Sequence, residues 1–419
     1  MNSKVKPIVL FLLTFVLAGT FYTYAQEKKN KGLKKGPNVA INITNNKKIP
    51  PKTYLNLGLL SNYSSLNGLG INVFSSINHF YSKGIQIAGI TNVTGMDVSG
   101  LQLSGFANVT GRTTRGITLS GLMNVNGKDA QGLIVSGLAN FTGKNSKGFI
   151  LSGIMNITGA KAYGLQIGGL ANIVSDDQKG IAFAGLMNVA GDTLRGGQVS
   201  AVLNVAGGTN EGVQLAAIGN VTVTNKGLQT ALANYTETNK GLQLAVANVA
   251  EHNHKGLQLG IVNINKDSIA AHQIGCININ PFTKVQMIIS GGNLNKFNMG
   301  VRFKNRYTYT ELGLGGYSMD LTENFSVSGY YRGGLYLPIG NKFDISADAG
   351  FYHIEALDNK NVKGCPARFY AIQPRINLEY HFTEKFGIFA SGGYYWARAY
   401  GHSSIYKHQA SFEAGIVLF

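Results

Sequence analysis

The chain has 419 residues, of which 55 are glycine and only 14% are charged, and its formal net charge is +17. An ordinary soluble domain has roughly 7% glycine and roughly 25% charged residues. This composition excludes a helical enzyme, and 44% hydrophobic residues are too many for a disordered chain. We therefore expect an all-β protein.

The first 25 residues have the features of a secretory signal peptide. Lys4 and Lys6 precede an apolar run from Ile8 to Gly19, and small residues stand three residues and one residue before a cleavage site that follows Ala25. The run is shorter than the roughly 20 residues that a membrane-spanning helix needs. No later stretch reaches 18 consecutive apolar residues, so we expect any membrane insertion to use strands.

Thirteen repeat units fill the middle of the chain. Nine glycines recur every sixteen residues from Gly84 to Gly212, and an asparagine follows each of them eight residues later. Four more units, from Gly227 to Ala271, have steps of 14 or 15 residues, and their asparagine comes seven residues after the start. We assign the repeated asparagines as a structural ladder: Asn92, Asn108, Asn124, Asn140, Asn156, Asn172, Asn188, Asn204, Asn220, Asn234, Asn248, Asn263 and Asn278.

Each unit alternates apolar and polar residues with period two, so we expect strands. In one architecture each unit is a coil of a parallel β-solenoid, and identical side chains stack from coil to coil. In the other, each unit is one strand of a single large up-and-down β-barrel. The late units lack one residue in the middle, and a corner between strands absorbs such a deletion better than a lipid-facing strand does. This favours a β-solenoid of about 13 coils, with the large barrel as the alternative.

The repeat motif also resembles a known family. Units such as Gly256-Leu257-Gln258-Leu259-Gly260, followed by Asn263, have the pattern GLQxGxxN. They look like the surface-repeat proteins of Gram-negative bacteria, in which tandem units precede an outer-membrane-type β-strand region. The resemblance covers about residues 55 to 419, and it implies a location in the cell envelope but no catalytic residues.

After Pro281 the repeats stop and aromatic residues become frequent, including the only tryptophan, Trp396. Apolar and polar residues alternate there, which is typical of a transmembrane β-barrel with aromatic girdles; a soluble eight-stranded barrel is the alternative. The chain ends on Phe419, which resembles the C-terminal aromatic signature of outer-membrane barrels. The eight expected strands are 284–292, 296–304, 307–317, 325–337, 343–354, 369–381, 386–399 and 409–419.

A barrel of eight strands has a lumen that side chains fill. We therefore expect a network of paired charges inside it, because charges that are buried must neutralise one another. The candidate members are Arg302, Lys304, Arg332, Asp344, Asp348, Arg375, Glu379 and Glu413.

Motifs for catalysis, cofactors and metals are missing from the sequence, which has no GxSxG, Walker loop or HExxH. His252 and His254 share one turn, which we interpret as a solvated turn rather than a metal site. Cys276 and Cys365 form neither a CxxC nor a zinc motif; they either form a disulfide or remain two buried thiols.

Together these features predict four segments: a signal peptide (1–25), a basic linker (26–50), a repeat β domain (51–280) and an outer-membrane-type barrel (281–419). We expect a non-enzymatic protein of the outer membrane or cell surface, without cofactors, that has a structural, adhesive or glycan-binding role. Its expected partners are outer-membrane lipid or lipopolysaccharide, acidic glycans and other surface proteins, and not nucleic acid. The alternative is a transport channel built from the repeats and the C-terminal strands together.

Overall fold

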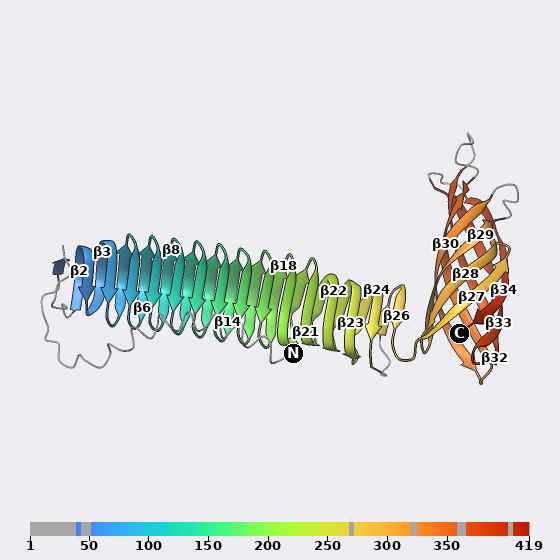
Figure 1. The fold of residues 1–419 in the computed structure, drawn as a ribbon, viewed down its shortest axis with the longest axis horizontal. Coiled ribbons are helices and arrows are strands. Elements are labelled where there is room, and N and C mark those ends of the chain that lie inside the picture. The colour runs from blue at the N-terminus through green and yellow to red at the C-terminus, as the bar shows by residue number, and fades with distance from the viewer. Residues whose placement is uncertain are drawn as a thin grey trace. The chain divides into compact units, whose positions relative to one another are not determined.

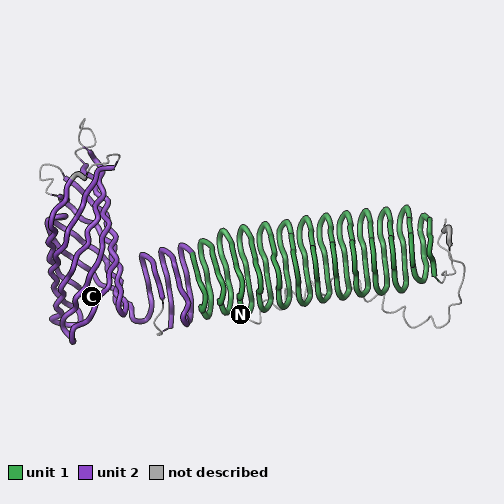
Figure 2. The backbone as a smooth tube through the Cα atoms, turned by 180° about the vertical axis from the view of Figure 1, so that it is seen from behind, with its two compact units in different colours: residues 1–244 green, residues 245–419 purple. Residues whose placement is uncertain are grey.

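The computed structural model describes residues 39–42, 52–267, 272–319, 325–357, 366–400 and 405–418. The expected signal peptide, most of the expected linker, Cys365 and Phe419 lie outside these residues. All the regular elements that the described ranges contain are strands, and no helix among them has the length and hydropathy to cross a bilayer. The chain divides into two compact units, residues 1–244 and 245–419 (Figure 2).

Successive repeats form the coils of a parallel β-solenoid (Figure 1). Strand β4 (Ser82–Ala88) pairs in parallel with β6 (Val98–Ser104), and β5 (Thr91–Thr94) pairs in parallel with β7 (Ala107–Thr110). Each residue therefore lies opposite the residue sixteen positions later. The parallel pairing confirms the β-solenoid, which has about 14 turns, and rules out the alternative in which the repeats are antiparallel strands of one large barrel.

The strand bounds follow the repeat closely. Three strands precede the first sixteen-residue unit and extend the stack in the N-terminal direction: β1 (Val39–Asn42), β2 (Lys52–Tyr63) and β3 (Ser65–Asn78). The remaining strands of the coils are β8 (Thr114–Ser120), β9 (Met123–Asn126), β10 (Ala130–Ser136), β11 (Ala139–Thr142), β12 (Ser146–Ser152), β13 (Met155–Thr158), β14 (Ala162–Gly168), β15 (Ala171–Val174), β16 (Gln178–Ala184), β17 (Met187–Ala190), β18 (Leu194–Ser200), β19 (Leu203–Asn210), β20 (Val213–Ala216), β21 (Gly219–Asn225), β22 (Leu228–Asn239), β23 (Leu242–Asn253), β24 (Leu257–Asn265), β25 (His272–Ile274) and β26 (Ile277–Ile279).

Each sixteen-residue coil has two corners. The first lies between the seven-residue and the four-residue strand, as at Gly105-Phe106, and we call it the apolar corner. The second, at 111–113 and its equivalents, leads to the next coil, and we call it the charged corner. The apolar corner interrupts the alternation of the sequence, because Phe106 is 47% exposed whereas Gln102 and Asn108 are buried. Continuous alternation, which would place these three side chains on one face, is therefore wrong.

The interior of the solenoid is mostly polar, although a few apolar side chains such as Ile134 and Ile150 are buried in it. Gln102, Asn108 and Thr110 are buried, while Leu101, Leu103 and Val109 lie on the outside. This arrangement is the reverse of an ordinary globular core, which is mostly apolar.

The missing residue of the late units is absorbed at the position of the apolar corner, as expected. Gln229 pairs with Gln214 and Asn234 pairs with Asn220, and all four side chains are buried. At this position β22 is one continuous strand, and the exposed residues Leu232 and Ala233 take the place of the corner between Gln229 and Asn234. This stretch is one residue shorter than in the preceding coil, and both side chains still point inward.

One column of the stack requires glycine. Gly132 has φ of +118°, and a Cβ atom on it would lie 2.0 Å from the carbonyl oxygen of Gly116 in the preceding coil. Only glycine tolerates both the backbone angle and this close approach, which explains why the sixteen-residue spacing is marked by glycine.

The C-terminal region is a closed antiparallel barrel of eight strands, as the sequence predicts. Strand β27 closes the barrel by pairing with β34. The observed bounds differ from the expected ones by a few residues at most: β27 (Lys284–Gly292), β28 (Asn295–Lys304), β29 (Thr308–Ser318), β30 (Ser326–Ile339), β31 (Phe343–Ala356), β32 (Arg368–Thr383), β33 (Phe386–Ala399) and β34 (Ile405–Leu418).

The two ends of the barrel differ in the lengths of their connections. At one end, residues 305–307, 340–342 and 384–385 join neighbouring strands. The other end has the connections 293–294, 319–325, 357–367 and 400–404. The chain enters β27 at Lys284, which pairs with Lys304, so it enters at the end with the uniformly short turns.

Candidate functional site

The thirteen predicted asparagines are all buried in the solenoid interior. Within residues 1–244, each asparagine side chain from Asn92 to Asn220 donates a hydrogen bond to the Oδ1 of the next asparagine in the ladder. The last acceptor is Asn234, and the distances are 2.8 to 3.1 Å. Within residues 245–419, Asn248 donates to Asn263, and Asn263 donates to Asn278. The amides form a continuous hydrogen-bonded network within the buried interior of each of these two stretches, and the hydrogen bonds of such a network strengthen one another in a low dielectric.

The asparagine amide also satisfies the backbone of the neighbouring coil. Asn140 Nδ2 donates to Asn156 Oδ1 at 2.9 Å and to the carbonyl oxygen of Leu151 at 2.6 Å. Each asparagine from Asn92 to Asn220 bonds in this way to the side chain and to the main chain of the next coil. This double role explains the identity of the residue, since a carboxylate cannot donate and a hydroxyl is too short to reach both partners.

Two further ladders were missed at the sequence level. Gln243 donates to Gln229, Gln229 to Gln214, and Gln214 to Gln198, each over 3.0 Å. Asn210 donates to Asn225, and Asn225 to Asn239, each over 2.9 Å. The glutamine ladder is visible in the sequence, because a glutamine stands two residues after the glycine in many repeats. Other residues, such as Thr118 and Ile134, take this position in some repeats and interrupt the pattern.

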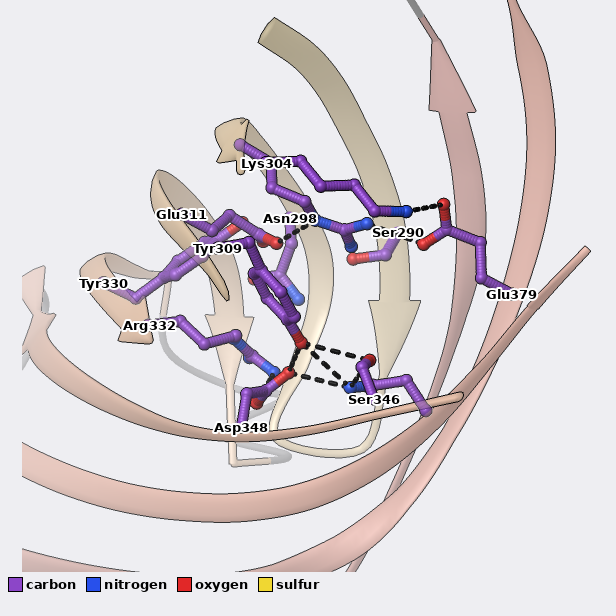
Figure 3. Close-up of polar contacts among 12 residues, drawn as sticks. Ser290, Asn298, Lys304, Tyr309, Glu311, Tyr330, Arg332, Ser346, Asp348 and Glu379 are labelled. Carbon is purple, nitrogen blue, oxygen red and sulfur yellow. Dashed lines mark hydrogen bonds and ion pairs between the residues drawn. The ribbon is translucent and has the colours of Figure 1, made fainter. Parts of the chain in front are cut away.

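The second polar cluster fills the barrel lumen, where all eight predicted charged residues are buried. At one level, Arg302 contacts Glu311 at 3.2 Å and Glu379 at 2.6 Å. Lys304 lies 3.5 Å from Glu379 (Figure 3). It also pairs with Asp344. The Arg302–Glu379 pair and the two pairs of Lys304 join strands that are not neighbours, so they cross the lumen. Arg302 and Glu311 lie opposite each other on the neighbouring strands β28 and β29.

A second level of the lumen is centred on Asp348. Its carboxylate contacts Arg332 at 3.1 Å and Arg375 at 3.0 Å, and it accepts hydrogen bonds from Tyr309 and Asn377. Arg375 also contacts Glu413 at 2.7 Å. Figure 3 shows Tyr309, Arg332 and Asp348 converging from three strands.

Glu311 is a member of this network that the sequence analysis omitted. It is 1% exposed and lies opposite Arg302 on one neighbouring strand and Arg332 on the other. Strand alternation together with antiparallel register could have identified it. With Glu311, five carboxylates face four cations, and His381 lies 2.9 Å from Asp344.

The lumen network is a structural plug. Its charges are paired with one another at contact distance, which is the arrangement that makes burial of several ions tolerable. Side chains that meet across the lumen fill it, and a barrel of this size is expected to enclose side chains rather than an aqueous channel.

Among the residues that the structure describes, two groups of side chains have the composition of a metal site. His252, His254 and Asp267 offer ligand atoms that all lie within 4.8 Å of one another, and three donors are the number found in open zinc sites. Asp344, Glu379 and His381 form a similar group, but Lys304 already supplies a cation there. His252 and His254 also lie 3.2 Å and 3.8 Å from Asp267 as ion pairs.

Cys276 is half-buried in the last coil. Its candidate partner Cys365 lies outside the described residues, so their pairing stays a prediction.

Ion pairs join neighbouring coils at the charged corner and at the residue before the repeated glycine. Lys161 contacts Asp177 at 2.9 Å, and this hydrogen bond lowers the pKa of Asp177. Glu211 contacts Arg195 at 2.8 Å and Lys226 at 3.2 Å, and hydrogen bonds from these two residues lower the pKa of Glu211.

Comparisons with protein-family models, with curated proteins and with solved structures gave no match for this chain. The resemblance in the repeat motif therefore remains a prediction, and a functional assignment depends on the geometry of the two folds.

Proposed function

We propose that this chain is an exported, non-enzymatic outer-membrane protein in which the eight-stranded barrel spans the bilayer and holds the solenoid at the membrane. The observation that carries the proposal is the distribution of side chains across the barrel wall. Charged residues are buried in the lumen, whereas apolar residues cover the exterior: Leu314, Leu335, Leu337, Ile376 and Phe412 are 65% to 72% exposed.

The length of the strands supports the same proposal. Strands β27 to β34 have 9 to 16 residues, and a tilted membrane-spanning strand needs about 9 to 11. A soluble barrel with this exterior would expose a large apolar surface to water, which monomeric soluble proteins avoid.

The turns support an orientation. Outer-membrane barrels have short periplasmic turns and longer extracellular loops. The chain passes from the last coil to β27 at the end with the short turns, so we place the solenoid on the periplasmic side. This favours a structural role inside the envelope over adhesion at the cell surface. The alternative of a transport channel required the repeats to be strands of the barrel. The repeats are coils of a solenoid, so this alternative does not apply.

Membrane insertion is tested with a pair of arginine substitutions on the barrel exterior. Ile376 lies at the middle of β32 and Ile339 at the end of β30, and both side chains are exposed. An arginine at the bilayer midplane costs about 2 to 4 kcal/mol, and near the interface only about 0 to 1. We expect Ile376→Arg to reduce the heat-modifiable, folded barrel in outer-membrane fractions, and Ile339→Arg to leave it intact. Equal, full recovery of both variants in a soluble fraction would refute the proposal.

The orientation is tested with single cysteines in a chain that carries Cys276→Ser and Cys365→Ser. Lys147→Cys places a thiol on the solenoid, and Tyr400→Cys places one at the long-loop end of the barrel. A membrane-impermeant maleimide should label Tyr400→Cys in intact cells and should label Lys147→Cys only after the outer membrane is permeabilised. Labelling of Lys147→Cys in intact cells would instead place the solenoid on the cell surface.

A further inference from the structure

The charged residues of the repeats are confined to one side of each coil. Nine ten-residue segments, each with the outer part of the long strand, the apolar corner and the short strand, contain no Asp, Glu, Lys or Arg. They are 85–94, 101–110, 117–126, 133–142, 149–158, 165–174, 181–190, 197–206 and 213–222. From residue 83 to residue 164, the opposite side carries seven Lys or Arg and two Asp. The solenoid of the first unit is therefore amphipathic in cross-section, with a basic side over these coils.

The apolar corner forms an exposed row of large hydrophobic side chains. Equivalent positions in successive coils stack along the same edge, so the row continues through the first unit. Its most exposed members are Phe74, Ile90, Phe106, Leu138, Leu170, Leu186, Ile218 and Leu232, which are 39% to 55% exposed.

The flank beside this row is also apolar. Ile85, Ile117, Phe149 and Ile181 are 40% to 58% exposed on the long strands. A shallow groove of about 380 Å³ crosses four coils next to the corner and is lined mainly by Ile87, Leu103, Leu119 and Val135. An apolar surface this continuous marks an interaction site rather than a solvated face.

The backbone of the apolar corner is already paired. Leu122 N–H donates to the carbonyl oxygen of Phe106 at 2.9 Å, and Leu138 N–H donates to that of Leu122 at 2.8 Å. Within hydrocarbon, every backbone polar group must find a partner inside the protein. The stack meets this requirement along the corner, and its polar side chains lie in the interior.

The dimensions of the coil match one leaflet of a bilayer. From Ile85 to the corner residue Ile90 the chain advances five residues, or about 16 Å at roughly 3.3 Å per residue. Half of a bilayer's hydrocarbon core is about 15 Å. Lys83 and its equivalents Arg115 and Lys147 are separated from this apolar stretch by one glycine, at the level where phosphate groups would lie.

We propose that the solenoid binds a phospholipid leaflet by inserting its apolar corner into the hydrocarbon, with the basic residues of the charged side at the phosphates. The apolar row and its flank provide the apolar surface that is buried in the hydrocarbon. The cations between residues 83 and 164 provide the attraction to anionic headgroups. A phospholipid surface is favoured over a second copy of the chain because the two sides of the coil reproduce the polarity gradient of a leaflet.

The test uses tryptophan fluorescence of the full chain in vesicles of phosphatidylethanolamine and phosphatidylglycerol. The background variant Trp396→Phe removes the only native tryptophan. Leu170→Trp then places the fluorophore at the apolar corner, and Ala160→Trp is the matched control at the charged corner. Circular dichroism of both variants checks that the β structure is retained.

We expect lipids brominated on their acyl chains to quench Leu170→Trp at least threefold more than Ala160→Trp, and aqueous iodide to show the reverse order. Equal quenching of both variants by iodide, with no effect of the brominated lipids, would overturn the proposal. Protection of Leu170→Trp from both quenchers would overturn it as well, because a second protein surface would then cover the corner.

This inference is separable from membrane insertion of the barrel. In the unmodified chain, Trp396 is 41% exposed on the barrel exterior, so its quenching by brominated lipids reports on the barrel alone. Quenching of Leu170→Trp without quenching of Trp396 would leave the solenoid proposal standing while the barrel proposal fails.

Discussion

Replacement of Asn140 by alanine tests whether the asparagine ladder holds the coils together. Asn140 accepts a hydrogen bond from Asn124 at 2.9 Å and donates to Asn156 and to the carbonyl oxygen of Leu151. In Asn140→Ala, one N–H of Asn124 and the Oδ1 of Asn156 lose their partner in the buried interior. Each orphaned polar group costs about 1 to 3 kcal/mol, so we expect about 4 kcal/mol of local destabilisation.

The effect should be confined to nearby coils, because each repeat of a solenoid contacts only its neighbours. Hydrogen exchange of the full chain, followed by mass spectrometry, measures this directly. A free-energy change of about 4 kcal/mol corresponds to nearly a thousandfold faster exchange, since about 1.4 kcal/mol is a factor of ten. We expect this in peptides covering 123–158, with the barrel strands unchanged.

Thr118→Val is the matched control. Thr118 is also buried, but its hydroxyl has no hydrogen-bond partner among the described residues. Its replacement by valine should change local exchange by less than about twofold, or slow it, because no bonded group is lost. If Asn140→Ala changes exchange no more than Thr118→Val does, the ladder does not stabilise the stack.

Three further predictions address the glycine column, the lumen and the ion pairs of Glu211. Gly132→Ala should destabilise the adjoining coils by several kcal/mol, because its Cβ would meet the carbonyl oxygen of Gly116 at 2.0 Å. Hydrogen exchange measures this against the control Gly197→Ala, where a Cβ meets nothing closer than 3.7 Å. Equal effects of the two substitutions would contradict the steric explanation. Arg332→Met should destabilise the barrel by about 3 to 5 kcal/mol, because it removes a partner of buried Asp348. The side chain of Arg368 is 64% exposed, so Arg368→Met should cost less than about 1 kcal/mol. Urea unfolding in lipid, followed by Trp396 fluorescence, distinguishes these values. Arg195 and Lys226 lower the pKa of Glu211, so the small contribution of its carboxylate to stability should be complete above the ordinary pKa and should disappear as the pH falls through the lowered pKa. Hydrogen exchange of residues 207–228, corrected for the intrinsic rate, should show this change in the wild type but not in Glu211→Gln. A loss of protection when the pH is raised would contradict the predicted sign.

The sequence contains most of the fold because the fold is repetitive. Stacking in register forces equivalent residues into equivalent environments, so the glycine and asparagine columns are visible as a sixteen-residue period. The barrel strands are visible for a similar reason, since residues such as Arg332 and Val327 alternate between lumen and exterior.

The remainder depends on three-dimensional pairing. Whether Phe106 points in or out depends on a two-residue corner that leaves no mark on the local alternation. The role of Glu311 depends on the register of β28, β29 and β30, which brings it beside Arg302 and Arg332. The inversion of polarity in the solenoid is another such case. Period-two alternation shows that Gln102 and Leu103 point to opposite faces, but not which of the two faces the interior.

Disulfide trapping tests the stacked arrangement of the repeats most directly. Val125 lies opposite Phe141 in the parallel register, whereas an antiparallel hairpin between the same units would place Val125 opposite Ile134. Paired strands lie about 4.8 Å apart, within the range that a disulfide bridges. In a chain with both native cysteines replaced by serine, Val125→Cys with Phe141→Cys should form a disulfide on mild oxidation, and Val125→Cys with Ile134→Cys should not. The opposite result would contradict the parallel solenoid.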